Sequence, residues 1–364
     1  MKTLLFTLEY PPFKGGVANY YGHVAQYWPL GESISVLDNN RGELMGSGKL
    51  GHWEWLKAVP ILRRRIKHDQ IDYVLVGQIL PLGTAVWLLS LIQPIRYAVF
   101  LHGMDLAYAW RTPRKRRLAT RILRRADRII AANSYVSSQL LNYLPELKDR
   151  MSVVNPGIDG EAPPVAEGAL NEMREHYHLQ GQTVLFSLGR LVKRKGIDIT
   201  IQALELIPEP LINSLRYFIA GTGRDEMYLK KLVPERFKEK IIFLGVINEE
   251  EKWRWLNLAD IFIMPSRNIV GDFEGFGIVY LEANLCAKPV IAGRSGGVAD
   301  AVCDNLNGLL VNPESPEDVK EAIIKLALDP NLRTELGRQG QARATHNFHW
   351  EKQVAEIFRI ISQI

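Results

Sequence analysis

Short runs rich in β-branched and aromatic residues alternate with segments of helical hydrophobic spacing along the whole chain. Parallel strands need a crossover connection, which is usually a helix, so this alternation predicts an α/β fold with parallel sheets. The predicted strands are residues 3–8, 34–37, 73–76, 97–100, 128–132, 152–154, 184–188, 217–220, 241–244, 261–264 and 290–292. The predicted helices include residues 17–28, 113–125 and 349–361, and one that ends near residue 206.

The regular pattern lapses after residue 159, where residues 160–168 combine proline, glycine and small residues without a hydrophobic period. Such a composition is typical of a linker. A chain of 364 residues is also too long for one core of ordinary size. We therefore predict two domains, residues 1–160 and 169–345, followed by a helical segment over residues 346–364.

The stretch from Gly271 to Glu282 contains two glutamates and a glycine-rich loop. Its glycines let the backbone approach a ligand closely, and the apolar spacing predicts a helix that begins near Phe276. The N-terminus of such a helix favours a phosphate. Glu274 and Glu282 would repel a phosphate, so we expect them to accept hydrogen bonds from sugar hydroxyls instead. The stretch therefore predicts a site for a nucleotide-sugar.

This stretch resembles the Glu-x7-Glu motif of retaining glycosyltransferases with the two-domain GT-B fold, specifically the large glycogen-synthase-like family numbered four. The resemblance extends from Gly15-Gly16 to Phe348-His349-Trp350. Residues 271–283, followed by the run from Ala292 to Gly297, look most like phosphatidylinositol mannosyltransferases. The resemblance implies two Rossmann-like domains with a cleft between them. The first would receive the acceptor, the second would bind the nucleotide-sugar, and the last helix would cross back onto the first.

The resemblance also implies roles for individual residues. Glu274 would hold the donor sugar and Glu282 the nucleotide ribose. His102, which follows a predicted strand at its ligand-binding carboxyl end, would lie against the donor sugar. The further donor contacts that we expect are Gly16, Gly189, Gly221, Val246, Ile247, Gly275, Phe276, Gly277 and Ile278, and the expected acceptor contacts are Gly15 and Asp105.

Arg190 and Lys195 flank a turn at the end of the predicted strand 184–188. Two fixed cations there would neutralise a diphosphate as its bond to the sugar breaks. They form the expected catalytic set with His102 and Glu274. Lys193 and Arg194 fit no such role and are expected on the surface. Asn248 and Glu251 have the spacing of a helix capping box.

Several other kinds of chemistry lack a signal in the sequence. There is no His/Cys cluster with metal-ligand spacing, no Walker loop and no Gly-x-Ser-x-Gly elbow. We expect neither a metal nor a cofactor. The alternatives that remain are a non-enzymatic nucleotide-binding module, an epimerase or a phosphorylase of the same architecture. For a transferase, similarity around residues 272–283 favours GDP-mannose, with a UDP-sugar (glucosyl or N-acetylglucosaminyl) as the second donor.

Charge is distributed unevenly along the chain. Residues 1–160 carry 21 Lys+Arg against 12 Asp+Glu, a net charge of +9, and the remainder carries 24 against 28, a net charge of −4. A dense basic run comprises Arg111, Arg114, Lys115, Arg116, Arg117, Arg121, Arg124, Arg125 and Arg128. It is either a solvated helix face or a surface that attracts an anionic membrane or a phosphorylated acceptor. No nucleic-acid-binding motif accompanies it.

The sequence shows no secretory signal and no apolar stretch near the length of a membrane helix. Cys286 and Cys303 are too few for a disulfide framework, and we expect both to be reduced. The predicted location is the cytoplasm, with the basic surface as a basis for peripheral attachment at the inner face of the membrane, and the predicted acceptor is lipid-linked or a saccharide.

Overall fold

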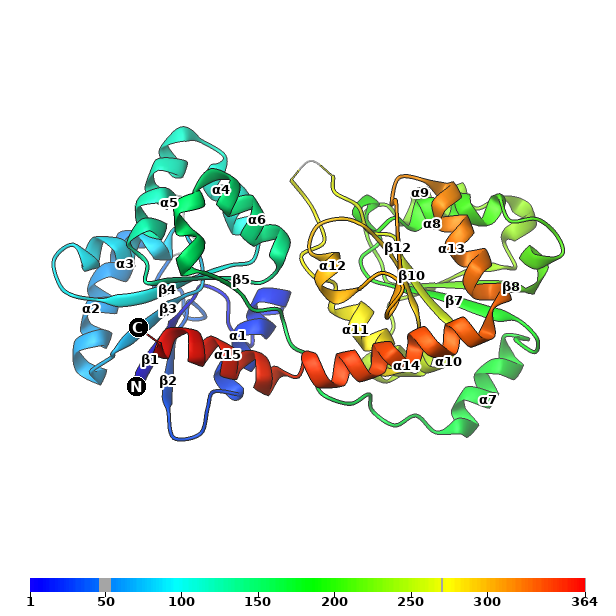
Figure 1. Cartoon of the computed structure of the whole chain (residues 1–364), viewed down its shortest axis with the longest axis horizontal. Helices are drawn as coiled ribbons and strands as arrows, with labels where there is room; N and C mark the ends of the chain where they lie inside the picture. Colours follow the sequence, from blue (N-terminus) through cyan, green and yellow to red (C-terminus); the bar gives the residue numbers. More distant parts are fainter. Residues whose placement is uncertain (46–53, 270, 364) are drawn as a thin grey trace. The chain divides into compact units, whose positions relative to one another are not determined.

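The computed structural model describes residues 1–45, 54–269 and 271–363. The chain divides into two compact units: unit 1 is Met1–Gly157 with Trp350–Ile364, and unit 2 is Ile158–His349. Each unit is built on a six-stranded sheet flanked by helices (Figure 1). The sequence pattern placed the linker at residues 160–168 and the final segment at residue 346, whereas the units divide after Gly157 and after His349.

The sheet of unit 1 has the strand order β2-β1-β3-β4-β5-β6, and neighbouring strands are parallel. The strands are β1 (Lys2–Phe6), β2 (Ser33–Leu37), β3 (Tyr73–Val76), β4 (Arg96–Leu101), β5 (Arg128–Ala131) and β6 (Met151–Val153). The order reverses between β1 and β3. In open α/β sheets ligands bind beyond the carboxyl ends of the strands at such a switch point.

Seven α-helices belong to the described part of unit 1: α1 (Gly16–Gln26), α2 (Ala58–Asp69), α3 (Leu82–Ser90), α4 (Met104–Trp110), α5 (Pro113–Arg125), α6 (Ser134–Tyr143) and, from the end of the chain, α15 (Trp350–Ser362). The unit also contains the 3₁₀ turns η1 (Glu54–Lys57) and η2 (Pro145–Arg150). Helix α15 joins the core of unit 1 because Trp350, Val354 and Ile357 pack with Leu5 and Tyr20. The last helix, predicted over residues 349–361, is therefore confirmed.

The sheet of unit 2 has the order β12-β11-β10-β7-β8-β9, again parallel. Its strands are β7 (Thr183–Leu188), β8 (Leu215–Ala220), β9 (Ile241–Gly245), β10 (Ile261–Met264), β11 (Val290–Gly293) and β12 (Gly308–Val311). The order reverses between β7 and β10. The loops that follow these two strands are therefore neighbours, and they carry residues 189–196 and 265–277.

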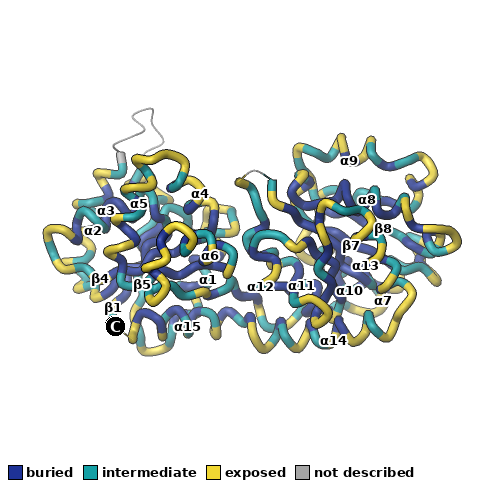
Figure 2. Tube along the Cα trace, turned by 45° about the horizontal axis from the view of Figure 1, so that its top comes forward, coloured by how far each residue is buried: buried dark blue, intermediate teal, exposed yellow. Residues whose placement is uncertain are grey.

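The helices of unit 2 are α7 (Glu167–His176), α8 (Ile197–Glu205), α9 (Glu226–Leu232), α10 (Glu249–Leu258), α11 (Ile278–Leu285), α12 (Val298–Ala301), α13 (Pro316–Leu328) and α14 (Pro330–Asn347), with the 3₁₀ turns η3 (Lys193–Lys195), η4 (Leu211–Ser214) and η5 (Glu235–Phe237). Alternate strand residues enter different cores: Leu185 and Ile263 pack on one face of the sheet, Phe186 and Phe262 on the other. The sheet is thus buried on both faces, as Figure 2 shows by the concentration of buried residues along the strands.

Candidate active site

The loop after β10 carries Glu274 into a buried cluster of charges in unit 2. Glu274 Oε2 accepts hydrogen bonds from Arg194 Nη1 and Lys195 Nζ, each at 2.6 Å, and lies 3.4 Å from Ser266 Oγ. Arg194, Lys195 and Glu274 are only 7%, 8% and 9% exposed. Both cations belong to η3, in the loop that follows β7. The switch point of the sheet therefore brings Lys195 to Glu274, although 79 residues separate them in the chain.

The prediction that Arg194 lies on the surface is wrong. Besides its bond to Glu274, Arg194 places Nε 3.0 Å from Asp272 Oδ1. The reason is the tight turn at Gly196, which has a φ of 70°, and where a Cβ atom would lie 2.1 Å from the carbonyl oxygen of Pro265. This close approach presses η3 against the loop after β10 and turns Arg194 inward, while Lys193 stays exposed as expected.

Arg267 is a second buried cation that the sequence reasoning missed. Its Nη2 lies 2.6 Å from Asp198 Oδ2, and its backbone N–H donates to the carbonyl oxygen of Arg194 at 2.8 Å. The two loops are thus tied together by main-chain and side-chain bonds. The available signal was the position of Arg267 three residues after a fully apolar strand, β10, where a charged residue enters the protein interior.

The charge state of Glu274 follows from competition between two effects. Burial raises the pKa of a carboxyl group, but the neighbouring Lys195 and Arg194 outweigh it, and the pKa of Glu274 is lowered. Glu274 is therefore ionised. The bonds of this carboxylate to protein groups all involve Oε2 within the described residues, so Oε1 remains for a donor such as a sugar hydroxyl.

Arg190, the other expected cation of this loop, behaves differently from Lys195. It is exposed, and none of the ion pairs found among the described residues includes it. The structure therefore brings Lys195 to Glu274 but does not bring Arg190 to that carboxylate. An exposed arginine beside a buried ion pair is still available to a ligand phosphate, because guanidinium groups bind phosphate through two parallel N–H bonds.

Glu282 lies in α11, where the structure confirms the expected helix but starts it at Ile278 rather than near Phe276. The side chain of Glu282 accepts a bond from Lys252 Nζ of α10 at 2.8 Å and is 19% exposed. Glu274 and Glu282 thus have different partners, one from η3 and one from α10. The two carboxylates therefore lie in separate environments along the same stretch of chain.

The other residues expected at the donor differ in what they offer a ligand. Phe276 is 5% exposed and its ring packs 5.6 Å from Phe348, so only its backbone is available. Ile278 is 38% exposed and is the first residue of α11, after the cap residue Gly277. Gly275 is partly buried in the same loop.

Glycine amides form hydrogen bonds between the carboxyl ends of three neighbouring strands, β7, β8 and β9, in the sheet of unit 2. The amide of Gly189 donates to Ala220 O at 3.1 Å, and that of Gly221 donates to Gly245 O at 2.7 Å. Gly221 has a φ of 122°, and a Cβ atom there would lie 2.0 Å from the carbonyl oxygen of Gly189. Packing alone therefore explains the glycine at 221, whatever it binds.

The turn after β9 leads into α10. Val246 is 77% exposed and Ile247 packs against the core of unit 2. The predicted capping box is confirmed: Asn248 Oδ1 accepts from the amide of Glu251 at 2.9 Å, and Glu251 Oε2 accepts from the amide of Asn248 at 2.7 Å. This cap fixes the direction in which the exposed Val246 backbone leaves the strand.

In unit 1, His102 directly follows β4 and is held by Tyr21. Tyr21 Oη donates to the carbonyl oxygen of Gly77 at 2.7 Å and lies 2.8 Å from His102 Nε2. Because a hydroxyl has a single proton, His102 Nε2 must be the donor in the second bond. Burial lowers the pKa of His102 to about 4, so the ring is neutral near pH 7 and Nδ1 keeps its lone pair. Such a histidine can accept a hydroxyl proton but cannot neutralise a phosphate.

Asp105 has a local role in the turn that places His102. Its Oδ1 accepts from the amides of His102 at 3.0 Å and of Gly103 at 2.8 Å. Burial raises the pKa of Asp105 to about 6, although the backbone N–H groups act in the opposite direction. Asp105 therefore fixes the position of the His102 ring through the backbone.

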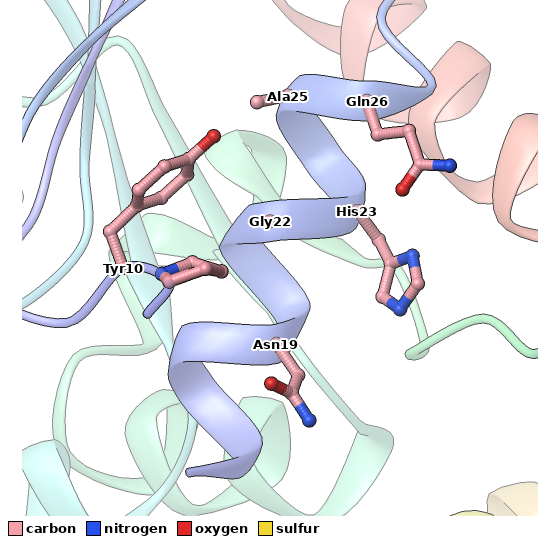
Figure 3. A pocket seen from close by; sticks show the side chains of 7 residues that line it. Tyr10, Asn19, Gly22, His23, Ala25 and Gln26 are labelled. Carbon is pink, nitrogen blue, oxygen red and sulfur yellow. The ribbon is translucent and has the colours of Figure 1, made fainter. Parts of the chain in front are cut away.

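Gly15 and Gly16 begin α1 on the same unit. Gly15 is the cap residue, and a Cβ atom at the exposed Gly16 would meet no atom within 4 Å. The fold therefore does not require glycine at position 16, which is consistent with a ligand that needs the space. Further along the same helix, a pocket of about 440 Å³ is lined by Tyr10, Pro11, Asn19, Gly22, His23, Ala25 and Gln26 (Figure 3).

Two further features bear on the chemistry. Within the described ranges, no group of three or more His, Cys, Asp or Glu side chains could hold a metal ion. Cys286 is buried and Cys303 partly buried, and both thiols are free. Every helix in the described part of the chain falls short of the length and apolarity that a membrane span requires.

Both units of the chain are similar to known glycosyltransferases. Residues 170–343 match the model of glycosyl transferases group 1, and residues 40–162 match that of glycosyltransferase family 4. A GDP-mannose-dependent alpha-(1-6)-phosphatidylinositol monomannoside mannosyltransferase of Mycobacterium tuberculosis is 28% identical, with 98% of this chain and 97% of the relative aligned. The corresponding monoacylated-substrate enzyme of Corynebacterium glutamicum is 27% identical over 96% of this chain and 95% of its own.

Solved structures agree with this. The structure of Anabaena HepE in complex with UDP superposes with a TM-score of 0.78 at 20% identity and covers both chains completely. The two parallel-sheet units and the matching models define a glycosyltransferase with the GT-B fold. The two family models and the full-length relatives support a glycosyltransferase of family four.

Proposed function

We propose that this protein is a retaining hexosyltransferase that takes its sugar from a nucleoside-diphosphate donor, with mannose from GDP-mannose as the leading choice. The observation that carries this proposal is the ionised, buried Glu274, whose Oε2 is held by Arg194 and Lys195 while Oε1 remains for a sugar hydroxyl. The mannosyltransferase relatives, aligned over nearly their whole length, support the choice of donor.

The second candidate donor is a UDP-sugar, because HepE was solved with UDP and with UDP-glucose. A thermal-shift screen with GDP, UDP and ADP, followed by release of nucleotide from the matching nucleotide-sugars, tests the proposal. A ligand that binds only the folded state raises its melting temperature by mass action. Stabilisation by a nucleotide without turnover of any nucleotide-sugar would instead identify a nucleotide-binding module.

In this proposal, different residues bind different parts of the nucleotide-sugar. Glu274 holds the donor sugar, Glu282 the ribose, and the backbone around Gly275, Gly277 and Ile278 the diphosphate. The backbone of Val246 and Ile247 holds the base, and Gly189 and Gly221 line the same edge of the sheet. In unit 1, His102 accepts a bond from a sugar hydroxyl, Gly16 leaves room for the diphosphate, and Gly15 and Asp105 serve the acceptor.

We expect Glu282→Ala to weaken binding of the free nucleotide, because a ribose hydroxyl loses a charged acceptor. The loss should be about 1.5 to 3 kcal/mol. Folding should change little, because Lys252 keeps Glu249 as a partner. Calorimetry with free nucleotide measures the effect, and Glu235→Ala at an exposed position of η5 is a control for the loss of a carboxylate in the same unit. Unchanged nucleotide affinity in Glu282→Ala would contradict the assignment.

We also expect transfer to need no divalent metal, since Arg190, Lys195 and backbone amides supply the positive charge toward the diphosphate. Activity should therefore persist in excess EDTA. The measurement is the rate of nucleotide release before and after chelation, with a metal-dependent transferase as the control. Loss of activity in EDTA that Mg²⁺ or Mn²⁺ restores would refute this part of the proposal.

For the acceptor we propose a lipid-linked or saccharide molecule, used at the inner face of an anionic membrane. The basic run in α4 to β5 supports this, because Arg111, Arg114, Arg116, Arg117 and Arg121 are all exposed. Lys and Arg side chains near an anionic surface contribute about 1 kcal/mol each.

A further inference from the structure

Three neighbouring helices of unit 1 line an open pocket that the sugar-transfer chemistry does not use. The pocket has a volume of about 410 Å³, and its lining residues come from the end of α4, from α5 and from the end of α6. Figure 1 labels these three helices in unit 1. It is lined by Trp110, Arg116, Arg117, Thr120, Arg121, Arg124, Tyr143 and Leu144. Trp110 is the last residue of α4, and His102 lies two residues before its first residue. The whole length of α4, about 10 Å at 1.5 Å per residue, therefore lies between them.

The sequence of α5 explains why arginines gather there. Thr112 caps the helix by accepting from the amide of Lys115, and Pro113 occupies the first position. Ala119, Ile122 and Leu123 point into the core, which leaves the opposite face to the arginines. Arg117, Arg121 and Arg124 follow one another at helical spacing, so their guanidinium groups share one side of the helix.

The charge of this pocket is largely uncompensated. Arg124 is held by Glu146, with Nε and Nη2 at 2.9 Å and 2.7 Å from Oε1. Arg116, Arg117 and Arg121 are exposed, and the ion pairs found in the described part of the chain include none of them. Among the described residues, those that line the pocket include no acidic one. Several like charges around one hollow repel each other, and a bound anion would relieve that repulsion.

The remaining lining residues also suit an anion with an apolar attachment. The indole Nε1 of Trp110 is buried and has no acceptor among the described residues. Its ring packs against that of Tyr143, with centroids 5.5 Å apart. Tyr143 is 54% exposed, and on α4 the side chains of Met104 and Tyr108 are 60% and 47% exposed. Indole and phenol rings with one apolar and one polar end are typical of membrane interfaces.

We propose that this pocket binds the phosphate headgroup of an anionic membrane phospholipid. The guanidinium groups and the Trp110 N–H donate to the phosphate oxygens, and the exposed aromatic rim rests at the level of the headgroups. The pocket thereby attaches unit 1 to the membrane. This assignment builds on the proposed membrane-bound acceptor, but it concerns attachment and not sugar transfer.

The test is sedimentation of the full chain with vesicles of phosphatidylcholine alone or mixed with phosphatidylglycerol, at low and high salt. The wild-type protein should bind only the mixed vesicles. Arg117→Gln combined with Arg121→Gln should weaken binding by about tenfold or more, since two cations are lost. The matched control, Arg63→Gln with Arg64→Gln, removes the same charge from exposed positions of α2, and it should weaken binding by less than about threefold.

Trp110→Phe separates the pocket from general charge, because it removes an N–H group and leaves every cation in place. We expect it to weaken binding by about threefold to tenfold. Addition of inorganic phosphate and glycerol 3-phosphate distinguishes a free phosphate from a lipid source. If the pocket binds a lipid headgroup, only high concentrations of either compound release the protein from the vesicles. Release at micromolar concentrations would identify a soluble phosphate as the ligand and overturn the proposal.

Equal losses in the α5 and α2 double variants, or binding that ignores lipid charge, would also overturn it. Release of nucleotide from a soluble nucleotide-sugar, measured on the same variants, keeps the two proposals apart. It should be unchanged in the α5 variants if only membrane attachment is lost. Absence of turnover in every protein, with pocket-dependent vesicle binding, would remove the proposed transfer and leave the headgroup site standing.

Discussion

Replacing Glu274 by Gln is expected to abolish sugar transfer and to weaken the nucleotide-sugar while leaving the free nucleotide bound. The reason is that Glu274 is assigned to the sugar alone, through an Oε1 that takes part in no bond to the described residues. Loss of a charged acceptor should cost about 1.5 to 3 kcal/mol of nucleotide-sugar binding. Calorimetry with nucleotide and nucleotide-sugar measures both, and equal losses for the two ligands would contradict the assignment.

The same substitution should lower the stability of unit 2. Arg194 and Lys195 are 7% and 8% exposed, and without Glu274 they lose the anion that both of them bind. Removal of one partner from a buried ion pair typically costs about 3 to 5 kcal/mol of unfolding free energy. Glu282→Gln is the matched control, because that carboxylate is less buried and its partner Lys252 has a second acid nearby.

The pH dependence gives an independent check on Glu274. Its pKa is lowered in the folded protein, so its contribution to stability is full above the pKa of an unfolded glutamate, about 4.3, and is lost as the pH falls through the lower folded value. The wild-type protein should therefore lose its stability advantage over Glu274→Gln on acidification. Chemical unfolding of both proteins across this range measures the difference.

Much of the fold follows from periodicity because its strands are buried on both faces. All six strands of unit 1 lie within two residues of their predicted ends. Strand β12, Gly308–Val311, was missed, since it is short, begins with glycine and follows a turn without hydrophobic alternation. Helix α12, Val298–Ala301, lasts a single turn.

The site was less predictable, for a physical reason. The Glu274 loop and the Lys195 turn could be identified from their glycines, but their contact depends on the strand order that places β7 beside β10. Which cation turns inward depends on the tight turn at Gly196. Arg190 and Lys195 look equivalent in the sequence, and Arg194 looks like a surface residue, yet Arg194 and Lys195 share the carboxylate while Arg190 remains exposed.

This difference between the two expected catalytic cations leads to separate expectations for them. Arg190→Ala should leave the unfolding free energy within about 0.5 kcal/mol of the wild-type value, because the side chain is exposed. Lys195→Ala should lower it, because Glu274 then keeps only Arg194 as a cationic partner. Stability is measured by chemical unfolding, and Lys193→Ala, at an exposed position of the same turn, is the control for both.

For turnover, by contrast, both variants should lose activity, because the proposed mechanism places each cation where negative charge develops on the departing diphosphate. A group that stabilises such charge is typically worth about a hundredfold or more in kcat, with a smaller change in KM. Lys195→Arg should restore stability in part, since it returns a cation to Glu274, but less of the turnover, since a guanidinium cannot occupy the same position as an ammonium group. Steady-state kinetics of nucleotide release measure the contribution of each cation to turnover. If Arg190→Ala had the same kcat as the control Lys193→Ala, Arg190 would have no role in catalysis. Lys195 would then have to neutralise the diphosphate while it also binds Glu274.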